Sequence, residues 1–275
     1  MNITFIGGGN MAGALISGLL QKGFDPKAIN VVEISAEGRA HLSEKFGVAT
    51  QEEIGAAAIS GDIVVLAVKP QQLFGVAAQL HGLLDGKLVI SIAAGVRSAD
   101  LSRWLGGHTM IVRAMPNTPA MVLAGVTGLC ALPEVPENQR SQAETILGAV
   151  GMTLWLEREE QMDAITAISG SGPAYVFLFI EALQEAAVGL GLTPDQARAL
   201  SLETFLGATK LALQSSEDAA TLRARVTSKG GTTESAILVM ESAGIKRVIT
   251  QAAQAACLRS RELGDELGKI GAGGS

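Results

Sequence analysis

The sequence contains few of the side chains on which enzyme active sites most often depend. Its 275 residues include three histidines, two cysteines and one tyrosine. They form no Ser–His–Asp arrangement, no catalytic carboxylate pair and no metal-ligand spacing. Cys130 and Cys257 have no nearby histidine, so we expect two buried, reduced thiols. His41, His81 and His108 are expected to be structural or on the surface, and no metal is expected.

Basic residues are also scarce. The chain has 21 Lys and Arg against 27 Asp and Glu, a net charge of −6, and no segment clusters the basic residues. Recognition of nucleic acid needs such clusters, so we expect no nucleic-acid partner. No apolar run reaches the roughly 20 residues that span a bilayer, and a first strand at Ile3 leaves no room for a signal peptide. We therefore expect a cytoplasmic protein with no membrane partner.

Apolar residues, by contrast, are abundant. They make up 48% of the chain, whereas charged residues make up 17%. A chain of this length more often forms two domains than one, and it can bury a large interior. Apolar surface left over after folding is available for contacts between subunits, which points to an oligomer.

The N-terminus has the pattern strand, glycine-rich turn, helix. A short apolar run, Ile3 to Ile6, is followed by Gly7-Gly8-Gly9-Asn10-Met11-Ala12 and then by apolar residues at helical spacing up to Gly23. The turn fits the G-x-G-x-x-G/A fingerprint of dinucleotide binding, in which the glycines permit a tight turn and close approach of a pyrophosphate. A second strand, Asn30 to Ile34, places the acidic Glu33 about 24 residues after Gly9, where a ribose partner is expected.

Further buried strands alternate with helices along the first half. The expected strands are Asp62–Val68, Lys87–Ile92, Met110–Ala114 and, as the last element of the sheet, Thr153–Leu156; helices are expected at Leu73–Leu84 and Ala99–Leu105. Continuous Val/Ile/Leu runs of this kind are typical of parallel strands covered on both faces. The sequence therefore predicts an α/β fold, with an N-terminal Rossmann-type, doubly wound, mostly parallel sheet.

Strand signals then cease, and long helical patterns follow. They occupy Gly172–Gly191, Pro194–Gln214 and Ile245–Leu267. Thr193 and Pro194 form an N-cap and first-turn proline, and Gly191 is a helix stop. We predict a Rossmann domain over residues 1–160, an all-α domain over residues 161–270 and a flexible tail at 271–275.

Ligands of doubly wound sheets bind beyond the carboxyl ends of the strands. Small residues or proline-fixed turns follow three strands, at Val68-Lys69-Pro70, Ala93-Ala94-Gly95 and Met115 to Pro119. Lys69 could instead be a solvated loop residue. Met115 to Pro119 could instead be a rigid turn without a ligand. The predicted cofactor-binding residues are Ile6, Gly7, Gly8, Gly9, Asn10, Met11, Ser35, Ala67, Val68, Lys69, Pro70, Ile92, Ala93, Ala94 and Asn117.

The residues near the second strand leave the choice of cofactor open. Glu33 suits a free ribose 2′-hydroxyl, which indicates NAD(H). Ser35 and Arg39 suit a 2′-phosphate, which indicates NADP(H). Both cofactors remain open, with NADP(H) slightly favoured.

A second anion-binding segment is expected at Thr227 to Ser242. Here Lys229, two glycines, Thr232 and Thr233 run directly into an apolar helical repeat. Glycines allow a close approach of the backbone, and the free N–H groups and dipole of a helix N-terminus favour an anion. An ordinary capped helix is the alternative.

The order of these motifs resembles the pyrroline-5-carboxylate reductase family over nearly the whole chain. Besides the first glycine-rich turn, it rests on Met115-Pro-Asn-Thr-Pro119, Ser169-Gly-Ser-Gly-Pro-Ala-Tyr175 and the Gly-Gly-Thr-Thr helix start. The chain departs from the family in having Lys229 where many members have proline, and Glu33-Ile34 where Asn-Arg or Ser is frequent. These departures concern the charge near the substrate and the cofactor preference.

The resemblance implies the last step of proline synthesis, NAD(P)H-dependent hydride transfer to the C=N bond of 1-pyrroline-5-carboxylate. It assigns substrate binding to Lys229, Gly230, Gly231, Thr232 and Thr233, with the Thr233 hydroxyl on the ring nitrogen. It also implies a homodimer formed through the helical domain, which some relatives extend to a ring of dimers.

Two other functions are compatible with the two-domain plan. One is a different imine or 2-oxo-acid reductase. Related enzymes acting on 3-hydroxy acids carry a catalytic lysine that is missing from Ala174 to Glu181. The other is a non-catalytic dinucleotide sensor. Whether the imine ring has five or six members is also open, because one methylene changes binding by only about 1–3 kcal/mol.

Overall fold

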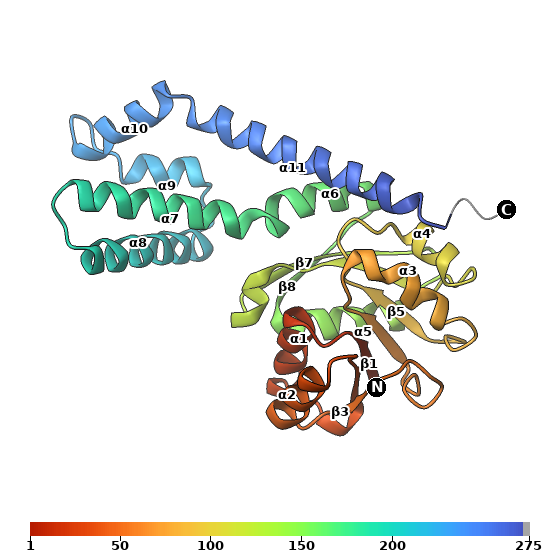
Figure 1. Cartoon of the computed structure of the whole chain (residues 1–275). Coiled ribbons are helices and arrows are strands. Elements are labelled where there is room, and N and C mark those ends of the chain that lie inside the picture. The colour runs from red at the N-terminus through yellow and green to blue at the C-terminus, as the bar shows by residue number, and fades with distance from the viewer. Residues whose placement is uncertain (272–275) are drawn as a thin grey trace. The chain divides into compact units, whose positions relative to one another are not determined.

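The chain forms two compact units, as seen in a computed structural model that describes residues 1–271. The first unit contains Met1–Ser171 together with the segment that begins at Ala255. The second unit is Gly172–Gln254. Figure 1 follows the chain by colour from the N-terminal strand to the C-terminal helix α11.

The first unit is built on an eight-stranded sheet with the order β3-β2-β1-β4-β5-β6-β7-β8. The strands are β1 (Ile3–Ile6), β2 (Ile29–Val32), β3 (Ala49–Gln51), β4 (Ile63–Leu66), β5 (Leu88–Ser91), β6 (Ile111–Met115), β7 (Gly125–Ala131) and β8 (Gly151–Trp155). Only the β6–β7 pair is antiparallel. Because β1 pairs in parallel with both β2 and β4, the strand order reverses there. The predicted doubly wound, mostly parallel sheet is confirmed.

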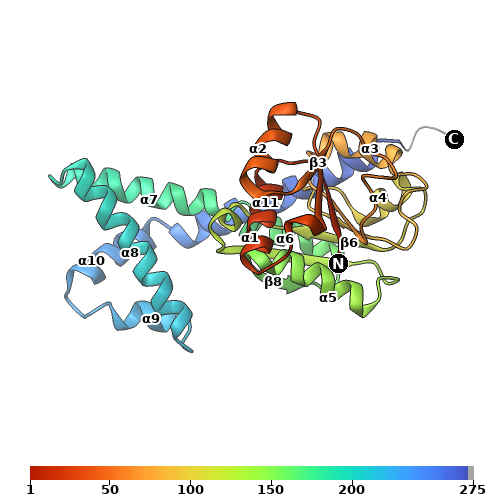
Figure 2. The same ribbon diagram turned by 90° about the horizontal axis from the view of Figure 1, so that it is seen from below.

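Both faces of the sheet are buried by helices. Alternate residues of β4 illustrate this, since Ile63 and Val65 belong to one apolar cluster and Val64 and Leu66 to the other. Helices α1 (Asn10–Gln21), α2 (Ala36–Phe46) and α5 (Glu137–Leu147) contribute to the first cluster; α3 (Pro70–Gln79) and α4 (Ser98–Trp104) contribute to the second. Figures 1 and 2 show the unit from two directions.

Short helical turns complete the connections of the first unit. They are η1 (Pro26–Ala28), η2 (Thr118–Val122), η3 (Gly148–Val150), η4 (Glu159–Gln161), α6 (Met162–Ile165) and η5 (Thr166–Gly170). The last three form one continuous helical path into the second unit, with a π-helical stretch at η5.

Most predicted strands agree with the structure to within a few residues, but two strands were not predicted as such. Strand β3 has only three residues, too few for a pattern of buried side chains to be visible. Strand β7 was not among the expected ranges. It contains two glycines and runs antiparallel to β6, so it lacks the continuous Val/Ile/Leu run of the others.

The second unit is entirely helical, as predicted for this part of the chain. It contains α7 (Gly172–Gly189), α8 (Pro194–Gln214), α9 (Ala219–Arg225), α10 (Thr232–Ser242) and the first part of α11 (Ile245–Gly268). The predicted start of α8 is confirmed. Thr193 and Gln196 form a reciprocal capping box, and Pro194 takes the first helical position.

This helical unit has almost no core of its own. Within residues 172–254 only Ala197 and Ser201 are buried. Large apolar side chains are exposed instead, among them Phe177 at 66% and Leu178 at 64% on α7. A surface of this kind is typical of an interface with another protein chain.

The observed division of the chain differs from the predicted boundary at residue 160. Residues 159–171 stay with the first unit because Met162 and Ala167 are buried there. The end of α11 also returns to the first unit, where the Trp104 indole N–H donates to the Ile270 carbonyl at 2.9 Å. Of the predicted flexible tail at 271–275, all but Gly271 lies outside the described residues.

One helical stretch is long and apolar enough to cross a membrane by length and composition. It runs from Glu159 to Gly189, and 6% of its apolar window is buried. The sequence analysis predicted no apolar run long enough to span a bilayer. The stretch combines four successive helical elements, η4, α6, η5 and α7, of which only the last gave a clear helical pattern in the sequence.

Candidate functional site

The glycine-rich loop between β1 and α1 is open toward solvent where a ligand would approach. A Cβ atom added to Gly9 would meet no protein atom within 4 Å, and this residue caps α1 without a side-chain hydrogen bond. Gly7 is constrained differently. Its φ is +97°, and a Cβ there would lie 2.8 Å from the Ala67 carbonyl oxygen. The loop therefore needs Gly7 to fold, whereas Gly9 keeps space free in front of a helix N-terminus.

A cavity of about 490 Å³ lies beside this loop, at the carboxyl ends of the strands around the reversal point. It is lined by Ile6, Gly7, Gly8, Gly9, Val32, Glu33, Ile34, Glu52, Glu53, Ile54, Ala67, Val68, Lys69, Gln72, Val76 and Gln79. Seven of the fifteen predicted cofactor residues are in this set: Ile6, Gly7, Gly8, Gly9, Ala67, Val68 and Lys69. Nucleotides bind doubly wound sheets at such a reversal point.

A smaller cavity of about 180 Å³ lies on the other side of the loop. Its lining includes the predicted Asn10 and also His41 and Lys45 of α2. His41 is exposed on α2, as expected of a surface histidine. The other two are structural, since His81 hydrogen-bonds the Trp104 carbonyl and His108 the Lys87 carbonyl.

Glu33 follows β2 and is held by the backbone. One of its carboxylate oxygens accepts the Gly8 N–H at 2.8 Å, and the other accepts the Ser35 N–H at 2.9 Å. The Ser35 hydroxyl accepts the Gly38 N–H and so caps α2. Arg39 donates to the carbonyls of Glu33 and Ile34 and to the carboxylate of Glu52.

Seven other predicted cofactor residues follow strands of the same sheet but line neither of the two cavities beside the glycine-rich loop. They are Met11, Ser35, Pro70, Ile92, Ala93, Ala94 and Asn117. Asn117 is buried and both ends of its amide are engaged. It donates to the Ser169 carbonyl at 3.0 Å and accepts the Val126 N–H at 2.9 Å. This side chain links the turn after β6 to η5.

The predicted substrate-binding residues lie together in the second unit, in the turn after α9 and the first residues of α10. They are not all available as donors. The Gly231 N–H donates to the Ser228 carbonyl at 3.0 Å, and the Gly230 N–H donates to the Glu234 carboxylate at 2.6 Å. The expectation of a free Gly231 amide is therefore wrong, because the tight turn itself uses that group.

The next two amides of the same segment are free. Thr232 and Thr233 are the first residues of α10, and neither backbone N–H has an acceptor within residues 1–271. No side chain caps this helix end. Both residues are exposed, and Thr233 carries a hydroxyl beside the free amides. The arrangement can bind a carboxylate through two N–H groups and the helix dipole.

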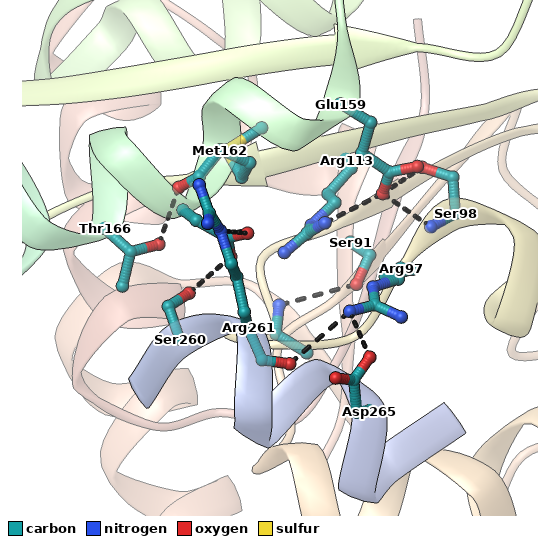
Figure 3. A network of polar contacts seen from close by, with 12 residues as sticks. Ser91, Arg97, Ser98, Arg113, Glu159, Met162, Thr166, Ser260, Arg261 and Asp265 are labelled. Carbon is teal, nitrogen blue, oxygen red and sulfur yellow. Dashed lines mark hydrogen bonds and ion pairs between the residues drawn. The ribbon is translucent and has the colours of Figure 1, made fainter. Parts of the chain in front are cut away.

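A third cavity, of about 480 Å³, is lined by charged residues of the first unit. Figure 3 shows its ion pairs, in which Arg113 of β6 donates to Glu159 and Arg97 donates to Asp265 of α11. The hydrogen bond to Asp265 raises the pKa of the Arg97 guanidinium. Oppositely charged partners satisfy one another here, so the Arg97–Asp265 pair fastens α11 to the start of α4 and the Arg113–Glu159 pair fastens η4 to the sheet.

Glu52 and Glu53 line the main cavity but were not identified from the sequence. They follow the short strand β3, which had also escaped detection. The sequence signal that could have identified them is their position: two adjacent acidic residues that follow Gly47, the residue that ends α2, by a few positions. Among the described residues, no group of three or more His, Cys, Asp or Glu side chains is arranged to hold a metal ion.

Comparisons with known proteins divide the chain in a similar way. A model of the family described as "Pyrroline-5-carboxylate reductase dimerisation" matches residues 159–263. A model described as "NADP oxidoreductase coenzyme F420-dependent" matches residues 2–95.

Individual relatives match over nearly the whole chain. The pyrroline-5-carboxylate reductase of Pseudomonas aeruginosa is 45% identical, over 97% of this chain and 98% of that protein. The structure of a pyrroline-5-carboxylate reductase from Coxiella burnetii is 47% identical with a TM-score of 0.91, covering 95% and 98%. A Plasmodium falciparum pyrroline carboxylate reductase structure with NADP bound is 29% identical with a TM-score of 0.86, covering 96% and 98%.

Proposed function

This chain belongs to the pyrroline-5-carboxylate reductase family, and on that premise we propose how its residues divide the work. The protein is an NAD(P)H-dependent oxidoreductase that reduces the C=N bond of 1-pyrroline-5-carboxylate to give L-proline, the last step of proline biosynthesis. The first unit binds the dinucleotide, and the start of α10 binds the carboxylate of the imine.

The main cavity and the loop beside it fit a dinucleotide. The open space at Gly9 and the uncapped first turn of α1 suit a pyrophosphate. The carboxylate of Glu33 suits a ribose hydroxyl. Lys69, which begins α3 and lines the cavity, supplies a positive charge. When bound, the reduced nicotinamide supplies the hydride.

The free amides of Thr232 and Thr233 are the observation that carries the substrate assignment. Two unpaired N–H groups at an exposed, uncapped helix end form an anion site, and the substrate is a carboxylate. Lys229, which stands two residues before the N-cap, adds attraction for the same anion. The Thr233 hydroxyl hydrogen-bonds the ring nitrogen of the imine.

No strong acid is required in this arrangement. A protonated cyclic imine is already a good electrophile, and reduction converts its C=N bond to a C–N bond with a secondary amine. The task of the protein is to hold the ring in register with the nicotinamide and to keep the carboxylate fixed. This accounts for the scarcity of histidine, cysteine and tyrosine.

The helical unit forms the interface of a homodimer. Its nearly absent core and the exposed Phe177 and Leu178 support this, as does the match of residues 159–263 to a dimerisation family. A second copy covering α7 also accounts for the apolar stretch Glu159–Gly189 without a membrane. We place the protein in the cytoplasm, with no nucleic-acid partner. A measurement of molecular mass in solution tests whether the dimers assemble further into a ring.

An absorbance assay tests the reaction directly. Purified protein is mixed with NADH or NADPH, and oxidation is followed before and after addition of 1-pyrroline-5-carboxylate or its six-membered homologue. The proposal requires oxidation that depends on the five-membered imine and yields proline. Binding of cofactor without imine-dependent oxidation would instead indicate a dinucleotide sensor, and faster turnover of the six-membered ring would reassign the substrate.

A further inference from the structure

The end of β2 is prepared for a ribose with a free 2′-hydroxyl. Both oxygens of the Glu33 carboxylate already accept a backbone N–H, from Gly8 and from Ser35. These two bonds fix the carboxylate at the wall of the main cavity while leaving each oxygen a further lone pair. A hydroxyl can donate to such an oxygen, whereas a phosphate monoester at neutral pH is mainly the dianion, which has no proton to donate.

Arg39, which lies six residues after Glu33, is already engaged. Arg39 donates from one nitrogen to the carbonyls of Glu33 and Ile34, each at 2.9 Å. Its other terminal nitrogen pairs with Glu52 at 2.9 Å, and its side chain is 20% exposed. Arg39 is also absent from the cavity lining. Recruiting it for a phosphate would require breaking the pair with Glu52.

The charges that do line the cavity oppose a phosphate. Glu33, Glu52 and Glu53 carry negative charge, and Lys69 is the only cation among the lining residues. A phosphate monoester adds about −1.5 to −2 charges at neutral pH. Like charges brought together in a partly enclosed cavity repel, and the single positive charge of Lys69 does not balance the three carboxylates.

We propose that Glu33 and the Arg39–Glu52 pair make this enzyme select NADH over NADPH. The inference rests on the proposed function, because it concerns the cofactor of that same site. It runs against the slight preference for NADP(H) expected from Ser35 and Arg39. In the folded chain, Ser35 caps α2 and Arg39 is committed to Glu52. It also predicts a difference from the Plasmodium falciparum relative, whose structure has NADP bound.

Binding and turnover together test the proposal. The affinities of the full-length protein for NADH and for NADPH are measured by calorimetry without imine, and kcat/KM is measured with each cofactor. We expect NADH to be favoured by about ten- to a hundredfold in both, the effect of one hydrogen bond to a charged group. Equal or tighter binding of NADPH would overturn the proposal. Absence of imine-dependent turnover with either cofactor would instead refute the proposed function, and the binding ratio would still decide the selectivity.

Variants separate the two parts of the selection. Glu33→Gln leaves only one acceptor for two N–H groups and so disturbs the loop as well as the charge. Glu52→Gln is the cleaner variant, because it weakens the ion pair that holds Arg39. It should move the NADPH/NADH ratio of kcat/KM toward NADPH by about two- to fivefold, in line with one weakened ion pair.

Glu37→Gln is the matched control. Glu37 lies in the first turn of α2, is exposed and does not line the cavity, so its loss changes net charge by the same amount. The cofactor ratio of this variant should stay at the wild-type value. If Glu52→Gln and Glu37→Gln shift the ratio equally, the arginine pair has no part in selection and that half of the proposal is wrong.

Discussion

The guanidinium of Arg113 donates to the carboxylate of Glu159 at 2.8 Å, and the side chain of Arg113 is 6% exposed. The same carboxylate oxygen accepts the backbone N–H and the hydroxyl of Ser98. One acceptor thus ties the middle of the sheet and the start of α4 to the helical path that leaves the first unit.

Removing that acceptor should destabilise the first unit. Glu159→Ala leaves the buried guanidinium of Arg113 without its carboxylate. We expect the free energy of unfolding to fall by about 3 kcal/mol, the lower end of the range for breaking a buried ion pair, because Glu159 is partly exposed. Thermal and urea unfolding measure the effect. The neighbouring Glu160→Ala is the control, since Glu160 is exposed and its side chain has no hydrogen bond among the described residues. Equal stability of the two variants would refute this role for Glu159.

Two glycines of the nucleotide loop should respond differently to alanine. Gly9→Ala should fold with an unchanged Tm, because the added Cβ meets no protein atom, yet bind cofactor at least about tenfold more weakly because it enters the ligand's space. Gly7→Ala should itself be destabilised, by its φ of +97° and the contact with Ala67. Calorimetric binding and melting curves distinguish the cases. Normal cofactor affinity in Gly9→Ala would place the pyrophosphate elsewhere.

Thr233 should matter for turnover more than for folding. Thr233→Ala removes a hydrogen bond to a charged ring nitrogen, worth roughly 1.5–3 kcal/mol, so kcat/KM should fall about ten- to a hundredfold. Thr233→Ser keeps the hydroxyl and should recover most of the activity. Steady-state kinetics with the imine varied measures both variants. An alanine variant as active as the serine variant would remove the hydroxyl from the mechanism.

His108 should make the protein sensitive to mild acid. Burial lowers its pKa from the ordinary 6.5, and its Nε2–H donates to the Lys87 carbonyl. Below the ordinary value the unfolded chain therefore binds a proton that the folded chain does not, so stability falls as pH drops through this range. When the pH is lowered from about 7.5 to 5.5, the range around the ordinary histidine pKa, the Tm of His108→Gln should fall less than the Tm of the wild type. The exposed His41→Gln is the control, and identical acid sensitivity in all three proteins would refute the assignment.

Charge on the exposed face of α7 should prevent assembly. Phe177→Asp and Leu178→Asp place a carboxylate at side chains that are 66% and 64% exposed, where it costs the isolated chain little. In a dimer formed through this face, the same carboxylate would be buried without a partner. Light scattering should therefore show monomers, with helix content retained by circular dichroism. A dimer of unchanged affinity would assign the interface to another surface.

Elements with strong local signals could be predicted from the sequence. The end of α7 follows from the stop at Gly191, and the start of α8 follows from Thr193 and Pro194, all of which act within a few residues. The parallel strands follow from their continuous apolar runs, and the glycine-rich turn from its spacing. Strand β3 gave no such signal, so Glu52 and its pair with Arg39 were missed with it.

Features that depend on distant parts of the chain could not be predicted in this way. The pattern of α11 does not reveal that its end joins the first unit, because the contacts of Asp265 and Ile270 are made with residues far earlier in the chain.

The return of α11 has a consequence for biosynthesis. Leu267 and Ile270 pack against the apolar cluster beneath α3 and α4, and they follow the last strand of the sheet by more than a hundred residues. A ribosome that has already released the whole sheet still exposes this patch until these two residues emerge. The nascent first unit is therefore completed only after α11 has been made, and a variant truncated before Leu267 would leave the patch uncovered.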